Sequence, residues 1–348
     1  MQTVRASSPL SRRVVDGPLA SRFKLKWKFR TGAAITGQPI VVRDKLIFGS
    51  EDKNIYSVSL DSGKRVWAVA TKGPIEASAR LVGDIVLIGS SDGRLYAIHV
   101  ATGAPRWAYR TEDKILGTAN VITSPAGDRQ WALVGSYDNR VHCVDVRTGR
   151  MIWTYETDNY VNGMPVIAGS SAIFGGCDGI LHVIETATGK KRTQIEIGDY
   201  IAGTATVDGD RAYLGHYGNA VICVDISQGK IIWTFRDKGF PYFASPAIND
   251  GMVVIGGRDR QIHCLDQGTG KQKWVFRTRG KVDGSATICD NKIVVGSEDG
   301  ILYLLDFKTG TLLWKYTIGR AVMCSPLIHD GRIYVGSDDG YLYAFESS

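Results

Sequence analysis

The sequence contains no run of about 18 or more apolar residues, so no segment is expected to cross a membrane as a helix. Residues 1–22 include several arginines but lack the apolar stretch that a secretion signal requires. Taken as it stands, the sequence therefore predicts a cytoplasmic protein. A periplasmic or membrane-associated protein is the alternative if the natural N-terminus is longer.

Charge is also scarce, and its excess is confined to one end. Charged residues make up 22% of the chain, and residues 1–30 hold eight basic and one acidic residue, 8 − 1 = +7, which equals the net charge of the whole chain. Proteins dedicated to nucleic acid usually carry a basic face on the folded domain itself, so no nucleic-acid partner is expected. Residues 1–22 are predicted to form a basic, disordered tail that allows weak contact with an anionic membrane surface.

The sequence does contain a repeat with a period near 40 residues. Tryptophan recurs at one position of this repeat, with Thr193 in the one place where it is missing, and a glycine recurs at another position. The tryptophans are Trp27, Trp67, Trp107, Trp153, Trp233, Trp274 and Trp314, and the glycines are Gly49, Gly89, Gly135, Gly175, Gly215, Gly256, Gly296 and Gly336. Short alternating apolar runs separated by Asp-Gly and Thr-Gly turns indicate about four strands per repeat. Eight such units predict an all-β, eight-bladed β-propeller of four-stranded antiparallel blades.

The two ends of the chain each supply part of one unit. The last unit, which begins near residue 320, stops at Ser348 without its tryptophan strand, and the first tryptophan strand, residues 23–29, has no inner strands before it. We therefore expect residues 23–29 to complete the last blade and to close the ring, which removes two open sheet edges. The predicted domain organisation is a tail over 1–22 and one propeller over 23–348.

The repeated motif resembles that of a known family. Gly89-Ser90-Ser91-Asp92-Gly93-Arg94-Leu95-Tyr96, followed by Thr102-Gly103 and Trp107, matches the quinoprotein-type (PQQ-like) propeller repeat. Among such proteins the chain is most similar to the propeller of the outer-membrane β-barrel assembly machinery and its relatives. That resemblance implies a propeller that contacts a partner protein through its loop face.

The same resemblance raises the question of a quinone cofactor. Quinone-dependent members of the family are larger, and an adjacent Cys-Cys pair, a calcium site and a catalytic aspartate shape their cofactor pocket. This chain has no Cys-Cys pair, and its units are too short to build a lid. We expect no cofactor, no metal and no dehydrogenase activity.

Residues that could carry chemistry occupy repeated positions and are predicted to be structural. His142, His182 and His263 stand where other units have tyrosine, and Cys143, Cys223 and Cys264 share one strand position with alanines of other units. The cysteines are expected to be free thiols that pack in the core. The aspartates before the third strand are expected to cap turns, because Asp bonds backbone N–H groups two residues further on.

The function is expected where the repeats differ, at the loop that enters each inner strand. Its middle residue is apolar throughout and should point into the blade, while its neighbours face the mouth of the channel. These neighbours form an aromatic sector from three successive blades, bordered by cations: Tyr160, Tyr200, Phe240, Tyr242 and Phe243, with Lys114 on one side and Lys281 and Arg320 on the other. Aromatic residues rimmed by charge are typical of protein-binding patches, although the rings would equally serve to plug the channel.

The favoured hypothesis is a non-catalytic scaffold that binds another protein through this face, in envelope protein assembly. The alternative is an enzyme or small-ligand binder that uses the axial mouth. Glu76 and Asp283 would be its acid and base candidates, and Lys114, Lys281 and Arg320 would bind an anion.

Overall fold

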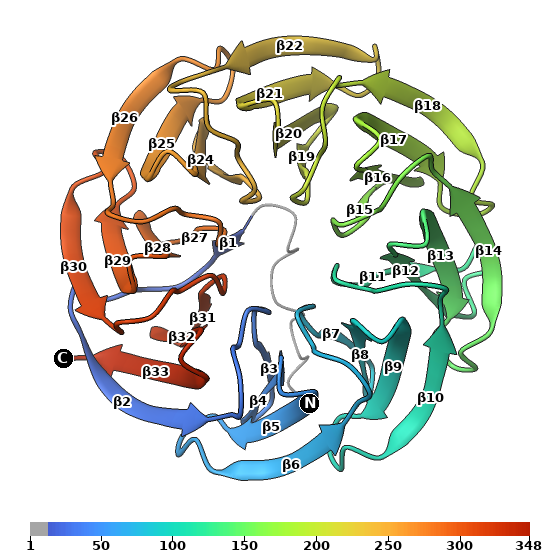
Figure 1. The fold of residues 1–348 in the computed structure, drawn as a ribbon, viewed down its shortest axis with the longest axis horizontal. Coiled ribbons are helices and arrows are strands. Elements are labelled where there is room, and N and C mark those ends of the chain that lie inside the picture. Colours follow the sequence, from blue (N-terminus) through green and yellow to red (C-terminus); the bar gives the residue numbers. More distant parts are fainter. Residues whose placement is uncertain (1–12) are drawn as a thin grey trace.

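The computed structural model describes residues 13–348, which form a closed ring of eight sheets (Figure 1). Seven of the sheets have four strands, and the sheet that contains β27 has a fifth, β1 (Val14–Val15). The described residues contain strands and turns and no helix. The prediction of an eight-bladed propeller is confirmed.

Each blade runs from an inner strand at the axis to an outer strand at the rim. The inner strands, for blades 1 to 8, are β3 (Ile40–Val42), β7 (Arg80–Val82), β11 (Asn120–Thr123), β15 (Val166–Ala168), β19 (Thr206–Asp208), β23 (Ala247–Asn249), β27 (Thr287–Cys289) and β31 (Leu327–His329). The second strands are β4 (Lys45–Ser50), β8 (Ile85–Ser90), β12 (Gln130–Gly135), β16 (Ser171–Gly175), β20 (Arg211–His216), β24 (Met252–Gly256), β28 (Lys292–Gly296) and β32 (Arg332–Gly336).

The remaining strands complete the blades in the same order. The third strands are β5 (Asn54–Ser59), β9 (Arg94–His99), β13 (Arg140–Asp145), β17 (Ile180–Glu185), β21 (Ala220–Asp225), β25 (Gln261–Asp266), β29 (Ile301–Asp306) and β33 (Tyr341–Ser347). The outer strands are β6 (Arg65–Ala70), β10 (Pro105–Arg110), β14 (Met151–Glu156), β18 (Lys191–Glu196), β22 (Lys230–Phe235), β26 (Gln272–Arg277) and β30 (Leu312–Thr317), with β2 (Phe23–Arg30) in blade 8.

Strand β2 closes the ring as predicted. It pairs antiparallel with β33, from Phe23 opposite Ser347 to Arg30 opposite Tyr341, so the two ends of the chain share blade 8. Phe23 then packs edge-on against Trp314 of blade 7, with ring centroids 5.5 Å apart. The closure is therefore held both by strand pairing and by contact with the neighbouring blade.

The recurrent glycine lies at the end of each second strand, where the next blade comes closest. A Cβ atom placed on Gly296 would lie 2.4 Å from Val322 Cγ1, and one on Gly49 would lie 1.9 Å from Ile75 Cγ2. Because neither glycine needs a left-handed backbone, the reason for glycine here is the close approach of the next blade. The contacted residues are the middle residues of the entry loops, and all are buried: Ile35, Ile75, Ile115, Val161, Ile201, Tyr242, Val282 and Val322. Burial of the apolar middle residue was predicted, but Tyr242 was also placed in the aromatic sector at the surface, and that placement is wrong.

The recurrent tryptophan joins blades at the rim. Trp67 Nε1 donates to the carbonyl of Val100 in the next blade at 3.1 Å, and Trp274 Nε1 donates to Phe307 at 3.0 Å. The indole ring of Trp274 covers Gly310, where a Cβ atom would lie 2.6 Å from the ring. Thr193 breaks this pattern, so blade 4 contacts blade 5 without an indole.

The prediction of a disordered tail over residues 1–22 is wrong for residues 13–22. Strand β1 runs parallel to β27 inside the ring (Figure 1), with Val14 opposite Ile288 and Val15 opposite Cys289. Leu19 is only 3% exposed, and its N–H donates to Asp290 Oδ2 at 3.1 Å. The inner edge of β27 offers free backbone groups, and this segment pairs with them. The rest of the predicted tail, residues 1–12, lies outside the described residues.

Candidate functional site: the loop face

The loop face is the side of the ring that carries the entry loops and the turns between second and third strands. One hydrogen bond recurs here in every blade. Its donor is the backbone N–H of the turn residue two positions after the repeated glycine. Its acceptor is the backbone carbonyl of the entry-loop residue that directly precedes the buried middle residue. The donors are Glu51, Ser91, Tyr137, Cys177, Tyr217, Arg258, Glu298 and Asp338, and the acceptors are Ala34, Pro74, Lys114, Tyr160, Tyr200, Pro241, Lys281 and Ala321. Each blade therefore presents two adjacent side chains near the mouth of the channel.

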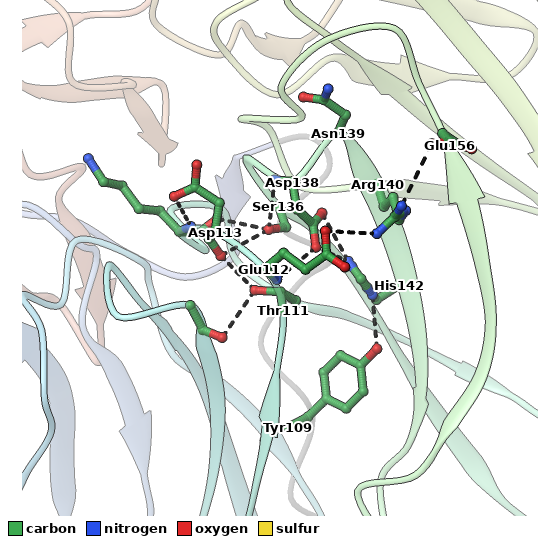
Figure 2. A network of polar contacts seen from close by, with 12 residues as sticks. Tyr109, Thr111, Glu112, Asp113, Ser136, Asp138, Asn139, Arg140, His142 and Glu156 are labelled. Carbon is green, nitrogen blue, oxygen red and sulfur yellow. Dashed lines mark hydrogen bonds and ion pairs between the residues drawn. The ribbon is translucent and has the colours of Figure 1, made fainter.

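The turn aspartates hold this face together, as Figure 2 shows for blade 3. Asp138 accepts from the N–H of Glu112 at 3.1 Å and lies 3.0 Å from Nε2 of His142. The other ring nitrogen, Nδ1, lies 2.9 Å from the hydroxyl of Tyr109 in the preceding blade. Burial alone would raise the pKa of Asp138, but the bond to His142 brings this pKa below its ordinary value. The predicted capping role holds for five turn aspartates, which accept from the N–H two residues further on: Asp52, Asp178, Asp259, Asp299 and Asp339. Asp138 accepts instead from the backbone of Glu112.

The histidines and cysteines are likewise part of the scaffold. His142, His182 and His263 are buried and lie within hydrogen-bond distance of Asp138, Asp178 and Asp259. All six cysteines are free, and burial raises the pKa of the Cys264 thiol to about 12. The expectation of packing thiols without disulfides is confirmed.

A single cluster of three potential metal ligands exists among the described residues: Asp237, Asp259 and His263. Its ligand atoms are engaged in hydrogen bonds. Gln261 Nε2 donates to both carboxylates, at 3.0 Å and 2.7 Å, and His263 Nε2 lies 2.9 Å from Asp259. The cluster is the blade 6 version of the same turn network.

Aromatic side chains gather on the loop face of blades 3 to 6. Tyr137 stacks on Tyr160, with centroids 4.7 Å apart and an interplanar angle of 9°. Tyr217 contacts Tyr200 at 5.9 Å and Phe243 at 4.4 Å. We call these five residues the aromatic arc. Tyr160, Tyr200 and Tyr217 are 44%, 51% and 44% exposed, values that a packed channel plug would not show.

The structure departs from the predicted sector in three places. Tyr242 is only 1% exposed, because it is the buried middle residue of its loop and packs against Gly215, so it is not a surface residue. Tyr137 and Tyr217 were not predicted; they come from the turns. The sequence signal that could have identified both tyrosines is their position two residues after the repeated glycine, where the repeats differ. Phe240 is 49% exposed in the same entry loop as Phe243.

The predicted acid pair of the alternative hypothesis is not brought together. Asp283 forms an ion pair with Arg258, whose Nη2 lies 2.7 Å from Oδ2, and the Arg258 guanidinium covers the Phe243 ring at 3.8 Å. Glu76 accepts a hydrogen bond from Ser91 Oγ at 2.9 Å. Glu76 and Asp283 thus lie in different blades, and each is bound to its own partner.

The predicted cations lie at the edges of the arc. Lys114 is exposed beside Tyr137, Lys281 lies 3.8 Å from Glu298, and Arg320 is exposed in the loop that enters blade 8. Four carboxylates also follow one another on this face from blade 7 to blade 2: Glu298, Asp338, Glu51 and Glu76. Burial, and after it the neighbouring Glu76 and Asp338, raise the pKa of Glu51, while burial and Glu298 raise that of Asp338.

The comparisons with known proteins can now be placed on this geometry. The family model described as "Outer membrane protein assembly factor BamB" matches residues 20–192, 177–321 and 278–348. The chain belongs to the BamB family. No curated protein matches the chain significantly. BamB of Moraxella catarrhalis is similar in structure, with a TM-score of 0.76 and 20% identity over 93% of this chain and 98% of that one.

Other solved structures share the fold of this BamB-family chain. The computationally designed Ika8 protein aligns with a TM-score of 0.79 and 17% identity, covering 91% of this chain and 97% of that one. A europium-containing methanol dehydrogenase aligns with a TM-score of 0.73 and 15% identity, covering 96% of each chain. At these identities the likeness establishes the fold alone. The described residues include no helix that is long and apolar enough to span a membrane.

Proposed function

We propose that this BamB-family chain is a non-catalytic scaffold that binds another protein through its loop face, in the assembly of outer-membrane proteins. The observation that carries the proposal is the aromatic arc. Three tyrosines from adjacent loops are about half exposed on one face, held by backbone hydrogen bonds to rigid turns. Rigid, exposed aromatics supply most of the binding energy in protein interfaces.

The family supports the same reading. The matching model is named for an assembly factor, and the structurally similar Moraxella protein carries the same name. The partner is expected to be a protein, since three rings of the arc are about half exposed, whereas a small-molecule site buries most of its ligand. The compartment stays a prediction.

The alternative, an enzyme or ligand binder at the axial mouth, draws support from the likeness to a methanol dehydrogenase. Two observations speak against it. Glu76 and Asp283 are each engaged elsewhere, and residues 13–15 occupy the channel beside β27. Incubation with PQQ and calcium should leave the purified protein without a quinone absorbance. A stoichiometric quinone spectrum would overturn the proposal.

Photo-crosslinking tests the scaffold function directly. A photoreactive phenylalanine at position 200 should crosslink to a discrete protein in cells, while the same residue at position 147, on the opposite face, should not. Tyr160→Ala should reduce this product. Tyr160→Ala and Tyr200→Ala should each lower stability by at most about 1 kcal/mol, because both rings are about half exposed. Trp314→Ala should instead cost roughly 3–5 kcal/mol through a core cavity.

The paired measurement separates binding from folding. If Tyr160→Ala and Tyr200→Ala melt as low as Trp314→Ala, the rings are packing residues and the binding face lies elsewhere. If position 200 yields no protein crosslink, the scaffold proposal fails.

A further inference from the structure

The loop face of blades 4 and 5 joins the exposed tyrosines to carboxylates. Asp158 lies two residues before Tyr160, and Asp199 directly precedes Tyr200. Glu196, at the end of β18, lines an open pocket of about 520 Å³ together with Asp178, Asp199 and Tyr200. We call Asp158, Glu196, Asp199, Tyr160, Tyr200 and Tyr217 the acidic–aromatic sector.

Few basic side chains lie near enough to these carboxylates to neutralise their charge. Among the described residues, Asp158, Glu196 and Asp199 form no ion pair with a basic side chain, whereas Asp178 bonds to His182. Arg140, at one border, is already shared by Glu112 and Glu156, at 3.4 Å and 3.7 Å (Figure 2). On the other side lies His216. Burial lowers the pKa of His216, the nearby Asp199 opposes this shift, and Arg236 adds to it.

Charge within these blades is segregated by face. Between residues 156 and 218 the basic residues are Lys190, Lys191, Arg192 and Arg211, apart from histidine. All four lie at turns or strand starts on the opposite face, where Arg192 pairs with Glu185 at 3.4 Å. The loop side of the same interval is therefore acidic, although the chain as a whole carries a charge of +7.

One carboxylate also has a structural role. The turn of blade 5 has Gly218 in place of the usual aspartate, and a Cβ atom there would lie 2.3 Å from Asp199 Oδ2. Asp199 thus fills the space of the missing turn side chain. Asp158 and Glu196 have no such role and are exposed, so they are the residues to test.

We propose that the acidic–aromatic sector binds a cationic segment of the partner protein, in which lysine or arginine alternates with apolar residues. The faces of the tyrosine rings attract a cation and the alkyl stem that carries it, and the nearby carboxylates neutralise the positive charge. The local field of these carboxylates attracts such a segment, since the excess positive charge of the chain lies in residues 1–30. The inference rests on the proposed scaffold function and specifies the partner that it fits.

A peptide assay tests the charge preference. The probe is a short fluorescein-labelled peptide of alternating lysine and leucine, with glutamate–leucine and lysine–serine peptides for comparison. The lysine–leucine peptide should bind best, and added salt should weaken it through screening. Asp158→Lys with Glu196→Lys should weaken binding about tenfold or more. Glu185→Lys, in the same blade on the opposite face, should leave it within about twofold.

The outcomes distinguish the two proposals. If the glutamate peptide binds better, or if the double charge reversal has no effect while Tyr160→Ala still reduces crosslinking at position 200, the partner is not cationic but the scaffold function stands. If the charge preference holds but position 200 captures no protein in cells, the scaffold function fails. Equal binding of the lysine–serine peptide would show that the tyrosines contribute nothing, which also overturns the inference.

Discussion

The third strand of most blades carries tyrosine or histidine at one position, and a buried histidine there has a second ring nitrogen that needs a partner. In blades 3 and 4 the preceding blade supplies it, whereas His263 in blade 6 takes it from Gln272 of its own blade, at 3.0 Å. Tyr56 donates its hydroxyl to Asp52 at 2.7 Å and packs against Phe29, which has no polar atom to offer. His142 has a second ring nitrogen, and Tyr109 supplies the partner for it. His182 is matched in the same way by Tyr155, at 3.0 Å. A buried polar atom without a partner is costly, so each histidine requires this second group.

Tyr109→Phe should therefore destabilise the fold by about 1–3 kcal/mol, because Nδ1 of buried His142 loses its partner. Tyr316→Phe is the matched control: Tyr316 occupies the same place beside Tyr343, whose hydroxyl is already bonded to Asp339. The control should change stability by less than about 0.5 kcal/mol in urea unfolding. Equal losses in the two variants would contradict the pairing rule.

The acidic side of the mouth predicts a pH effect with a definite sign. The pKa of Glu51 is raised in the fold by burial and then by Glu76 and Asp338, so its ionised form is disfavoured there. The stability that protonated Glu51 contributes is fully present below the ordinary carboxyl pKa of 4.5. It is lost as the pH rises through the raised pKa that Glu51 has in the folded protein. Glu51→Gln should melt higher than the native chain at pH about 7.

The same variant should lose this advantage in acid, below the ordinary carboxyl pKa. Asp44→Asn is the opposite case, since Lys45 lowers the pKa of Asp44 in the fold. It should leave the melting temperature unchanged or lower it at neutral pH. A Glu51→Gln variant that melts lower than the native chain at neutral pH would show that Glu51 is stabilised by a cation.

At the scale of the element, each blade is attached to the next at two radii. Near the axis the Cα of a glycine contacts the middle residue of the next entry loop. At the rim, six of the repeated tryptophans each cover the glycine of the turn between the third and outer strands of the next blade. Blade 4 lacks the outer contact because Thr193 replaces tryptophan, and Ile195 is the side chain that approaches Gly229, at 3.9 Å. The inner contact is present in all eight blades, so it defines the spacing of the ring.

Gly296→Ala should be strongly destabilising, because its Cβ would lie 2.4 Å from both the side chain and the carbonyl of Val322. Overpacking of this kind costs about 1–3 kcal/mol or more. Gly268→Ala is the control, since the nearest atom to its Cβ is Asp266 Oδ1 at 3.5 Å and its backbone is not left-handed. Thermal unfolding should show a large loss for the first and little or none for the second.

For the whole molecule, the N-terminal segment does more than close the ring. Val14 and Val15 pair with β27 inside the channel, and Leu19 packs with Phe23, Cys289 and Ile328. The segment thus ties blade 7 to blade 8 at the seam where the ring is closed. This also reduces the room for a ligand at the axis, which leaves the loop face as the accessible surface.

Removing residues 1–30 should abolish cooperative folding, because blade 8 loses its outer strand and β33 becomes an open edge. Removing residues 1–20 should also lower the melting temperature, by a smaller amount, since burial of Leu19 alone is worth about 1.5–3 kcal/mol. Leu19→Ala tests the second effect without a truncation. If the shorter truncation melts like the full chain, the β1–β27 pairing does not contribute to stability.

The sequence by itself determined the fold: the repeat, the number of blades and the closure by residues 23–29 all follow from periodic turns and apolar alternation. It also identified the structural histidines, cysteines and aspartates, because residues that interchange at one repeated position share one packing environment. Tyr160, Tyr200 and Phe243 were found for the opposite reason, as departures from the repeat.

Only the tertiary structure decided which of these side chains meet. Tyr242 was predicted at the surface together with Phe240 and Phe243 but is buried. It takes the middle position of the entry loop, and that position points into the blade. Tyr137 contacts Tyr160, about 23 residues away in sequence, and Tyr217 contacts Tyr200, about 17 residues away. No local sequence pattern encodes these two contacts. The pairing of β1 with β27 joins residues more than 270 positions apart. The tyrosine contacts depend on how loops of the same or neighbouring blades pack, and the β1–β27 pairing depends on the closure of the ring, which brings the two ends of the chain together.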